Sequence, residues 1–238
     1  MFNKLKALTQ RKSLDVMSGI NSYGRQLSES EIQSQKHRDF IGGMWSEIGQ
    51  LQFNFMLEQG LQPEHKILDI GCGCLRGGIH FIDYLNAGNY YGLDINASLI
   101  EAAQREVKQA QLEEKNPNLL VSEQFAINQF QQQFEFMLSV SLFSHLPMNI
   151  IIRCLSAVQK NLAAEGKYFS TFFIAPHSAH IAPINHHPSP IITNYDCDPF
   201  HYSIEEISFM AHVAGLEATL IGDWNHPRHQ QMVSFTQK

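Results

Sequence analysis

The feature that most constrains the fold of this chain is the segment 65–78, which reads HKILDIGCGCLRGG. Its apolar run Ile67–Ile70 predicts a short buried strand. Gly71 and Gly73 then break the strand, and a helical pattern of apolar residues resumes at Leu75. A strand, a glycine turn and a helix together predict a cradle for a nucleotide, because glycine lets a ligand approach the backbone and a helix start offers unpaired N–H groups.

The spacing of the glycines indicates which kind of nucleotide fits this turn. Glycines at 71, 73, 77 and 78 depart from the G-x-G-x-x-G spacing that seats the pyrophosphate of a dinucleotide. Asp69, at the end of the strand, would also repel a pyrophosphate, whereas its carboxylate suits a ligand with ammonium and sulfonium cations. An NAD-dependent oxidoreductase is therefore a weak alternative. An ordinary strand end, with no ligand at Asp69, stays open at this stage.

A second carboxylate follows at the end of the next predicted strand, Tyr90–Asp94. It lies roughly 20 residues beyond the glycine turn, which is where a βαβ unit places an acid on a ribose diol. Asp94 is therefore predicted to bind a ribose, with a solvated strand end as the alternative.

An acid before G-x-G, with a second acid one strand later, resembles the class I S-adenosylmethionine (SAM) methyltransferases. The resemblance implies that the region of Asp69 receives the methionine end of SAM and that the glycine backbone passes under its ribose. It also implies that the end of the third strand, at Glu123, Gln124 or Phe125, contacts adenine. The cofactor-binding residues expected from the resemblance are Asp69, Gly71, Cys72, Gly73, Arg76, Gly77, Asp94, Ile95, Gln124, Phe125 and Ser139.

The resemblance extends to a bacterial subgroup of small-molecule or glycan-associated methyltransferases through two further segments. These are SLFSHLP at 141–147 and GDWNHPR at 222–228. The pair Glu123-Gln124 departs from the pattern, because a more acidic pair is common there. The subgroup implies SAM-dependent transfer of a methyl group to an O or N atom of a small molecule or sugar. A catalytically silent SAM-binding partner or scaffold protein is the alternative.

Strands and helices alternate from residue 65 onward, which predicts a parallel α/β sheet. The last two predicted strands, 218–222 and 232–235, have a short connection without a helix and must therefore pair antiparallel. The expected fold is a Rossmann-like doubly wound, mostly parallel sheet that ends in an antiparallel hairpin, with an N-terminal helical extension.

The chain divides into two predicted parts. Residues 1–41 are expected to form an arm and a helix, which a capping box at 28–31 opens. Residues 42–238 are expected to form the methyltransferase domain, and its proline- and histidine-rich segment 175–202 reads as a substrate or lid loop. A second helix, 44–58, contains Gly49, which is unfavourable inside a helix, and Trp45, which is either a lid aromatic or a core residue.

His145 is the leading candidate for a catalytic base, because it follows the fourth strand and histidine titrates near neutral pH. A cap for the next helix is the alternative role. His201, Tyr202 and His226 are weaker candidates. Two arginines each have two possible roles. Arg76 either orients Asp69 or closes the SAM pocket, and Arg228 either pairs on the surface or binds an acidic substrate group.

Composition narrows the partners of the 238-residue chain. A net charge of −6 gives no general attraction for nucleic acid, and no apolar run reaches the roughly 18 residues of a membrane helix. We therefore expect a small-molecule or sugar acceptor, no nucleic acid and no membrane, and the sequence leaves room for a homodimer. The four cysteines form no zinc or disulfide pattern, and the loop histidines lack acidic or cysteine partners. No metal site and a cytoplasmic location are expected.

Overall fold

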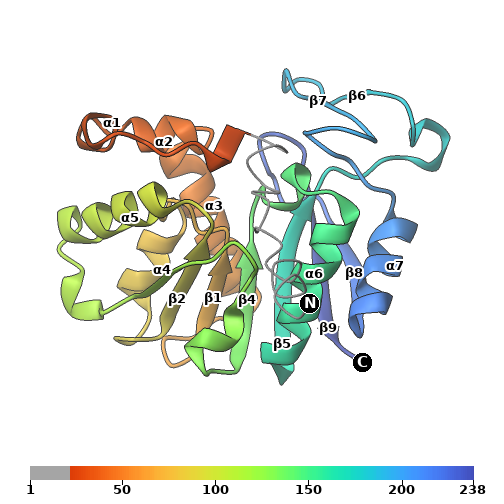
Figure 1. Cartoon of the computed structure of the whole chain (residues 1–238). Coiled ribbons are helices and arrows are strands. Elements are labelled where there is room, and N and C mark those ends of the chain that lie inside the picture. Colours follow the sequence, from red (N-terminus) through yellow and green to blue (C-terminus); the bar gives the residue numbers. More distant parts are fainter. Residues whose placement is uncertain (1–21) are drawn as a thin grey trace, which may run out of the picture.

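The computed structural model describes residues 22–238. Its centre is a seven-stranded sheet in the order β3-β2-β1-β4-β5-β9-β8 (Figure 1). The first five strands of the chain run parallel, whereas β9 lies antiparallel between β5 and β8. The strands are β1 (Ile67–Ile70), β2 (Tyr90–Asp94), β3 (Asn118–Val121), β4 (Phe134–Ser139), β5 (Leu162–Phe172), β8 (Leu216–Gly222) and β9 (Gln231–Gln237). The predicted fold class, with its antiparallel hairpin, is confirmed.

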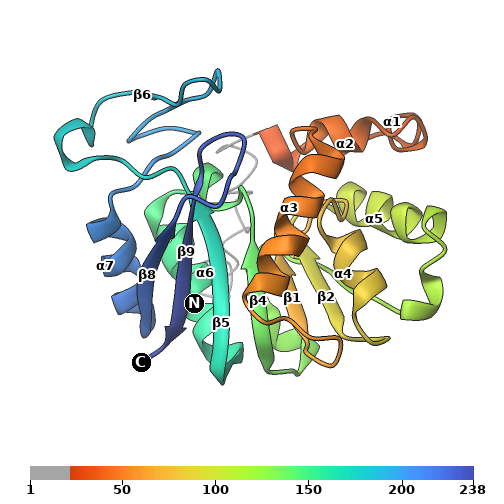
Figure 2. The same cartoon turned by 180° about the vertical axis from the view of Figure 1, so that it is seen from behind.

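Helices cover both faces of the sheet (Figures 1 and 2). They are α1 (Glu29–Gln33), α2 (Lys36–Phe40), α3 (Trp45–Glu58), α4 (Gly78–Tyr84), α5 (Ala97–Gln109), α6 (Met148–Asn161) and α7 (Ile204–Ala214). Side chains of β1 alternate between two cores: Ile67 packs with residues of α3, α4 and α5, and Leu68 with residues of α6 and α7. No helix within residues 22–238 is both long and apolar enough to cross a membrane.

The N-terminal extension is tied to the sheet domain by a buried carboxylate. Glu106 of α5 accepts hydrogen bonds from His37 at 2.6 Å and from two nitrogens of Arg38 at 2.7 and 2.8 Å. The capping box at Ser28 is present, but one predicted helix is two short ones, because Gln35 adopts a left-handed backbone with φ 59°. The part of the predicted arm at residues 1–21 lies outside the described residues.

Two details of the glycine segment and of α3 differ from a regular helix pattern. The helix after the turn begins at Gly78 and not at Leu75, because Leu75 itself has a positive φ of 74° while its side chain is fully buried. Gly49 of α3 is present because a Cβ there would collide with the backbone carbonyl oxygen of Arg76. Close approach of α3 to the turn therefore explains a glycine that its own helix disfavours. Trp45 stacks on Arg38 and lies outside the cavity described below.

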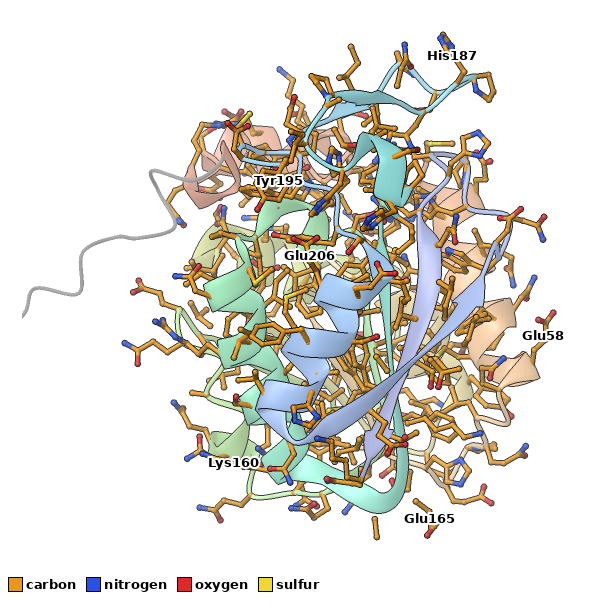
Figure 3. All side chains as sticks on the ribbon, turned by 90° about the vertical axis from the view of Figure 1, so that its right-hand side faces the viewer. Glu58, Lys160, Glu165, His187, Tyr195 and Glu206 are labelled. Carbon is orange, nitrogen blue, oxygen red and sulfur yellow. The ribbon has the colours of Figure 1, made fainter. Side chains whose placement is uncertain are left out.

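The insertion 175–202 is not structureless, since it holds a small hairpin of β6 (Ile184–Asn185) and β7 (Ile192–Thr193). Figure 3 shows His187 at the outer tip of this region, above α7. Two histidines stabilise it internally, because His186 and His201 both hydrogen-bond the buried hydroxyl of Thr193. A third, His180, ties it to α7 through a hydrogen bond with Glu206 at 2.7 Å. Within residues 22–238, no group of three His, Cys, Asp or Glu side chains is arranged to hold a metal ion.

Candidate active site

A cavity of about 320 Å³ lies beyond the carboxyl ends of β1, β2 and β4. This size falls within the range of small-molecule sites, and the position is where ligands bind in open α/β sheets. The N-terminal extension and the β6–β7 hairpin both lie beyond this end of the sheet (Figures 1 and 2). Both contribute to the wall: Tyr23 and Ile41 come from the extension, and Ile191 and Pro199 come from the insertion.

The glycine turn exposes its backbone to this cavity. Gly71 and Gly73 have φ values of 74° and 54°, a conformation that glycine adopts without a steric penalty. The turn is held against β2, because the amides of Gly71 and Cys72 donate to the carbonyl of Leu93 at 2.8 and 3.1 Å. The amide of Gly73 donates to Asp94 Oδ2 at 2.9 Å. The predicted cradle is therefore formed by two strand ends bonded to each other.

Asp94 is the first of two carboxyl groups on the cavity wall. It is buried, and its Oδ1 accepts the amide of Asn96 at 2.8 Å. Burial raises the pKa of Asp94, whereas the amides of Asn96 and Gly73 act in the opposite direction. Each oxygen has a further lone pair for a hydroxyl donor.

Asp69 is the second carboxyl group, and it lies deeper. It receives a hydrogen bond from the hydroxyl of Tyr90 at 2.9 Å, and burial raises its pKa to about 7. No cation of residues 22–238 forms a salt bridge with it. A ligand ammonium group in the cavity would therefore favour the charged form of Asp69.

His145 lies on the opposite wall, in the 3₁₀ turn Phe143–His145 that follows β4. Its Nδ1 donates to Asp198 Oδ1 at 2.6 Å, and its ring lies 4.7 Å from that of Tyr23. A carboxylate that accepts from Nδ1 selects the tautomer in which the proton lies on Nδ1 and Nε2 carries the lone pair. Asp198 thus fixes the orientation of the His145 ring on the cavity wall.

Comparison with known proteins identifies the domain. Residues 68–168 match a family model described as a methyltransferase domain. The match begins on β1 and ends in β5, and so it includes the glycine turn, Asp94 and His145. The chain carries a class I SAM-dependent methyltransferase domain.

Solved methyltransferases share this fold at low identity. A SAM-dependent methyltransferase from Clostridium acetobutylicum superposes with a TM-score of 0.63 at 10% identity, covering 88% of this chain and 99% of that one. A putative O-methyltransferase from Nostoc punctiforme gives 0.63 at 18% identity, covering 98% and 66%. A glycopeptide N-methyltransferase in complex with S-adenosylhomocysteine gives 0.61 at 12% identity, covering 80% and 90%.

Most of the predicted cofactor residues of the methyltransferase lie together. The cavity wall includes Asp69, Gly71, Cys72, Gly73, Arg76, Gly77, Asp94 and Ile95. Phe125 lines a second, smaller hollow of about 40 Å³, which Gly71 and Asp94 also border. This hollow is shared with Glu123, another residue of the predicted adenine contact.

Two predicted cofactor residues lie elsewhere. Ser139 is fully buried and bonds the hydroxyls of Tyr168 and Ser170 on the neighbouring strand β5. It is the last residue of β4, and the cavity wall includes the next residue, Val140. Gln124 is exposed and borders neither hollow, since the strand-end turn points its side chain to solvent. Neither residue lines either hollow, and their contact with the cofactor stays a prediction.

The alternative catalytic side chains also lie outside the cavity. His201 is buried against Thr193, Tyr202 donates to the carbonyl of Leu146 at 2.6 Å, and His226 is buried behind the wall. Arg76 does line the cavity, but it bonds the carbonyls of Ile41 and Gly43 and not Asp69. Arg228 is a wall residue and makes no salt bridge within residues 22–238.

The sequence reasoning missed several wall residues of the methyltransferase. They are Tyr23 and Ile41 of the extension, Gln52 of α3, and Gln230 before β9. Asp198, the partner of His145, was also missed. No local pattern marks these positions, since each is brought in by a segment distant in the chain.

Proposed function

We propose that this methyltransferase transfers the methyl group of SAM to an O or N atom of a small molecule or sugar. The observation that carries the proposal is that His145, which is hydrogen-bonded to Asp198, lines the same cavity as the glycine turn, Asp69 and Asp94. A cofactor site and a proton acceptor thus share one hollow. The solved relatives include proteins named as an O- and an N-methyltransferase, which is consistent with either acceptor atom.

The residues present fit SAM. The bare backbone of Gly71 and Gly73 would accommodate its ribose, Asp94 would accept from the ribose hydroxyls, and the buried Asp69 would face its ammonium group. The hollow at Phe125 is the place for the adenine ring. When bound, SAM supplies a methyl group on a sulfonium that is already activated for displacement.

The chain itself supplies alignment and proton removal. The apolar side chains of Ile41, Leu142 and Ile191 on the wall limit water near the acceptor. His145 Nε2 takes the proton that an oxygen or nitrogen acceptor loses as its bond to the methyl carbon forms, and Asp198 holds the ring in the required tautomer.

The parts of the chain have distinct roles in this proposal. Residues 42–238 form the catalytic domain, the helices before Gly42 close the cavity, and the segment 175–202 serves as a lid that also carries Asp198. A small-molecule or sugar acceptor is part of the proposal. A cytoplasmic location and a homodimer stay predictions.

Calorimetry with S-adenosylhomocysteine (SAH) tests the cofactor half, and transfer from methyl-labelled SAM to a panel of small alcohols, amines and sugars tests the acceptor half. We expect binding and labelled product. Absence of SAH binding at millimolar ligand would refute the cofactor site. Binding without product over the whole panel would favour the catalytically silent SAM-binding alternative. The glycine spacing and the methyltransferase family match argue against NAD as the cofactor.

A further inference from the structure

Two guanidinium groups lie at one corner of the cavity, and neither forms a salt bridge with a carboxylate of residues 22–238. Arg76 enters from the turn after β1, and Arg228 enters from the loop between β8 and β9. Both bind the same tripeptide: Arg76 donates to the carbonyls of Ile41 and Gly43, and Arg228 donates to that of Gly42. These carbonyls are neutral, so neither positive charge is balanced by its hydrogen bonds.

Arg76 is only 6% exposed, yet its Nε has no hydrogen-bond partner within residues 22–238. A buried N–H without an acceptor is costly, and native proteins rarely leave one unless a ligand or water completes it. Burial, and then the nearby charge of Arg228, lowers the pKa of Arg76 to about 10. Two like charges held close together, one of them buried, favour a counter-anion.

Gln230 adds an aligned donor to the same corner. Its Oε1 accepts from the hydroxyls of Thr171 at 2.6 Å and Ser141 at 3.1 Å, which fixes the orientation of the amide. Its NH₂ group makes no hydrogen bond within residues 22–238, although Gln230 lines the cavity. His226 accepts the amide of Arg228 on Nδ1, and its buried Nε2 has no hydrogen-bond partner in the described part of the chain.

The acidic groups of the site are engaged elsewhere. Asp69 accepts from Tyr90, Asp94 from the backbone, and Asp198 from His145. Asp69 attracts Arg76 through space, but no acid of residues 22–238 forms a salt bridge with Arg76 or Arg228. The corner defined by Arg76, Arg228 and Gln230 therefore offers donors and positive charge that no ion pair within these residues neutralises. This is the chemistry that recognises a carboxylate, phosphate or sulfate group.

The place of this corner in the sheet indicates which ligand supplies the anion. Asp94 ends β2, whereas Gln230 adjoins the end of β5, with β1 and β4 between those two strands. Ser141, which bonds Gln230, lies on the segment after β4 that also carries His145. The corner thus belongs to the side of the cavity where the proton acceptor lies.

We propose that Arg228 and Gln230, with Arg76 beside them, bind an anionic group of the methyl acceptor, so that the substrate is an acidic small molecule or an acidic sugar. The proposal rests on the proposed function, because it places the acceptor beside His145. The carboxylate of the cofactor is the competing source of the same chemistry, and the experiment separates the two.

The test measures sulfate and phosphate binding to the SAH-saturated protein by calorimetry, at constant ionic strength set with chloride. We expect saturable binding by the wild type, weakened by at least about tenfold in Arg228→Gln, with SAH affinity retained. Arg228→Lys should recover part of the anion affinity, because lysine keeps the positive charge but lacks the planar guanidinium that donates two parallel hydrogen bonds. Arg153→Gln, which removes an exposed arginine of α6, is the matched control and should change neither affinity.

Three results would overturn the proposal. The first is no anion binding to the SAH-saturated wild type. The second is equal anion binding by the wild type and both Arg228 variants. The third is a loss of SAH affinity in Arg228→Gln that matches the loss of anion affinity, which would assign the corner to the cofactor carboxylate. Failure of the wild type to bind SAH at all would instead refute the proposed function, and is measured separately in chloride buffer without sulfate or phosphate.

Discussion

Two opposed influences act on the pKa of Asp69, namely burial and a cationic ligand. Burial raises its pKa to about 7 from an ordinary value of 3.8, while a cationic ligand would lower it again. In the ligand-free protein, the folded state therefore holds a proton that the unfolded chain releases between about pH 4 and pH 7. Because the folded state binds more protons in this window, the free energy of unfolding falls as the pH rises through it.

The first prediction concerns a variant that lacks the titrating carboxyl group of Asp69. Asp69→Asn should lack this part of the decline in unfolding free energy between about pH 4 and pH 7, because its side chain does not ionise. Urea unfolding at several pH values measures the difference between variant and wild type. Parallel profiles over this range would show that Asp69 titrates as it does in the unfolded chain.

Asp94 carries the second prediction at the residue scale. Asp94→Ala should weaken SAH binding by roughly 1–3 kcal/mol, because it strands the ribose hydroxyls and the amide of Gly73. Asp83→Ala, which truncates an exposed aspartate of α4, is the matched control and should bind like the wild type. Calorimetry with SAH measures both, and an unchanged affinity in Asp94→Ala would remove this carboxylate from the site.

At the scale of an element, α3 depends on how closely it approaches the glycine turn. An alanine normally stabilises a helix interior relative to glycine, by about 1 kcal/mol. At position 49 the added methyl would meet the carbonyl oxygen of Arg76, and His80 Nε2 would lie 3.2 Å away. Tertiary packing therefore reverses the sign of the local preference.

The third prediction follows from this contact. Gly49→Ala should lower the free energy of unfolding by about 1–3 kcal/mol, because α3 or the turn must shift. Ser46→Ala, at an exposed site one turn earlier in α3, should be neutral or slightly stabilising. Urea unfolding compares them. A stabilised Gly49→Ala protein would mean that α3 can move away from Arg76 without cost.

At the scale of the whole molecule, the cavity is an assembly of distant segments. The extension, the glycine turn, the segment after β4, the insertion and the β8–β9 loop each form part of its wall. The His145–Asp198 pair is the clearest example, because it joins residues 53 positions apart in the chain. In the proposed mechanism, proton removal therefore depends on correct docking of the insertion.

The fourth prediction tests this dependence with a double-mutant cycle. His145→Ala should reduce methyl transfer by at least about a hundredfold with little change in SAH affinity, and Asp198→Ala should reduce it as well. Because both side chains act as one unit, the double variant should be little worse than His145→Ala. Transfer from methyl-labelled SAM measures the rates. Fully additive losses would show that Asp198 acts on something other than His145.

Much of the fold could be predicted from local patterns. The short apolar strands, the glycine turn and the helix stripes are repeated at the periods of a strand and a helix, and those periods are properties of the backbone. The resulting sheet order then places Asp69, Gly71 and Asp94 at one edge. Capping at Ser28 and Ser203 is local in the same way, since each cap involves residues within one turn.

Interactions between segments that are distant in the chain required the folded molecule. Ser139 bonds side chains of the neighbouring strand β5 and does not line the cavity, whereas Arg228 lines it because the β8–β9 loop reaches Gly42. The hydrogen bond between Asp198 and His145 forms only when the insertion docks against the segment after β4. The alternation of apolar and polar residues encodes which face of an element is buried, and so the sequence alone determined the sheet and its cofactor edge. The path of a loop depends on the surfaces it meets, and so the proton acceptor's partner and the cationic corner emerged only from the packed structure.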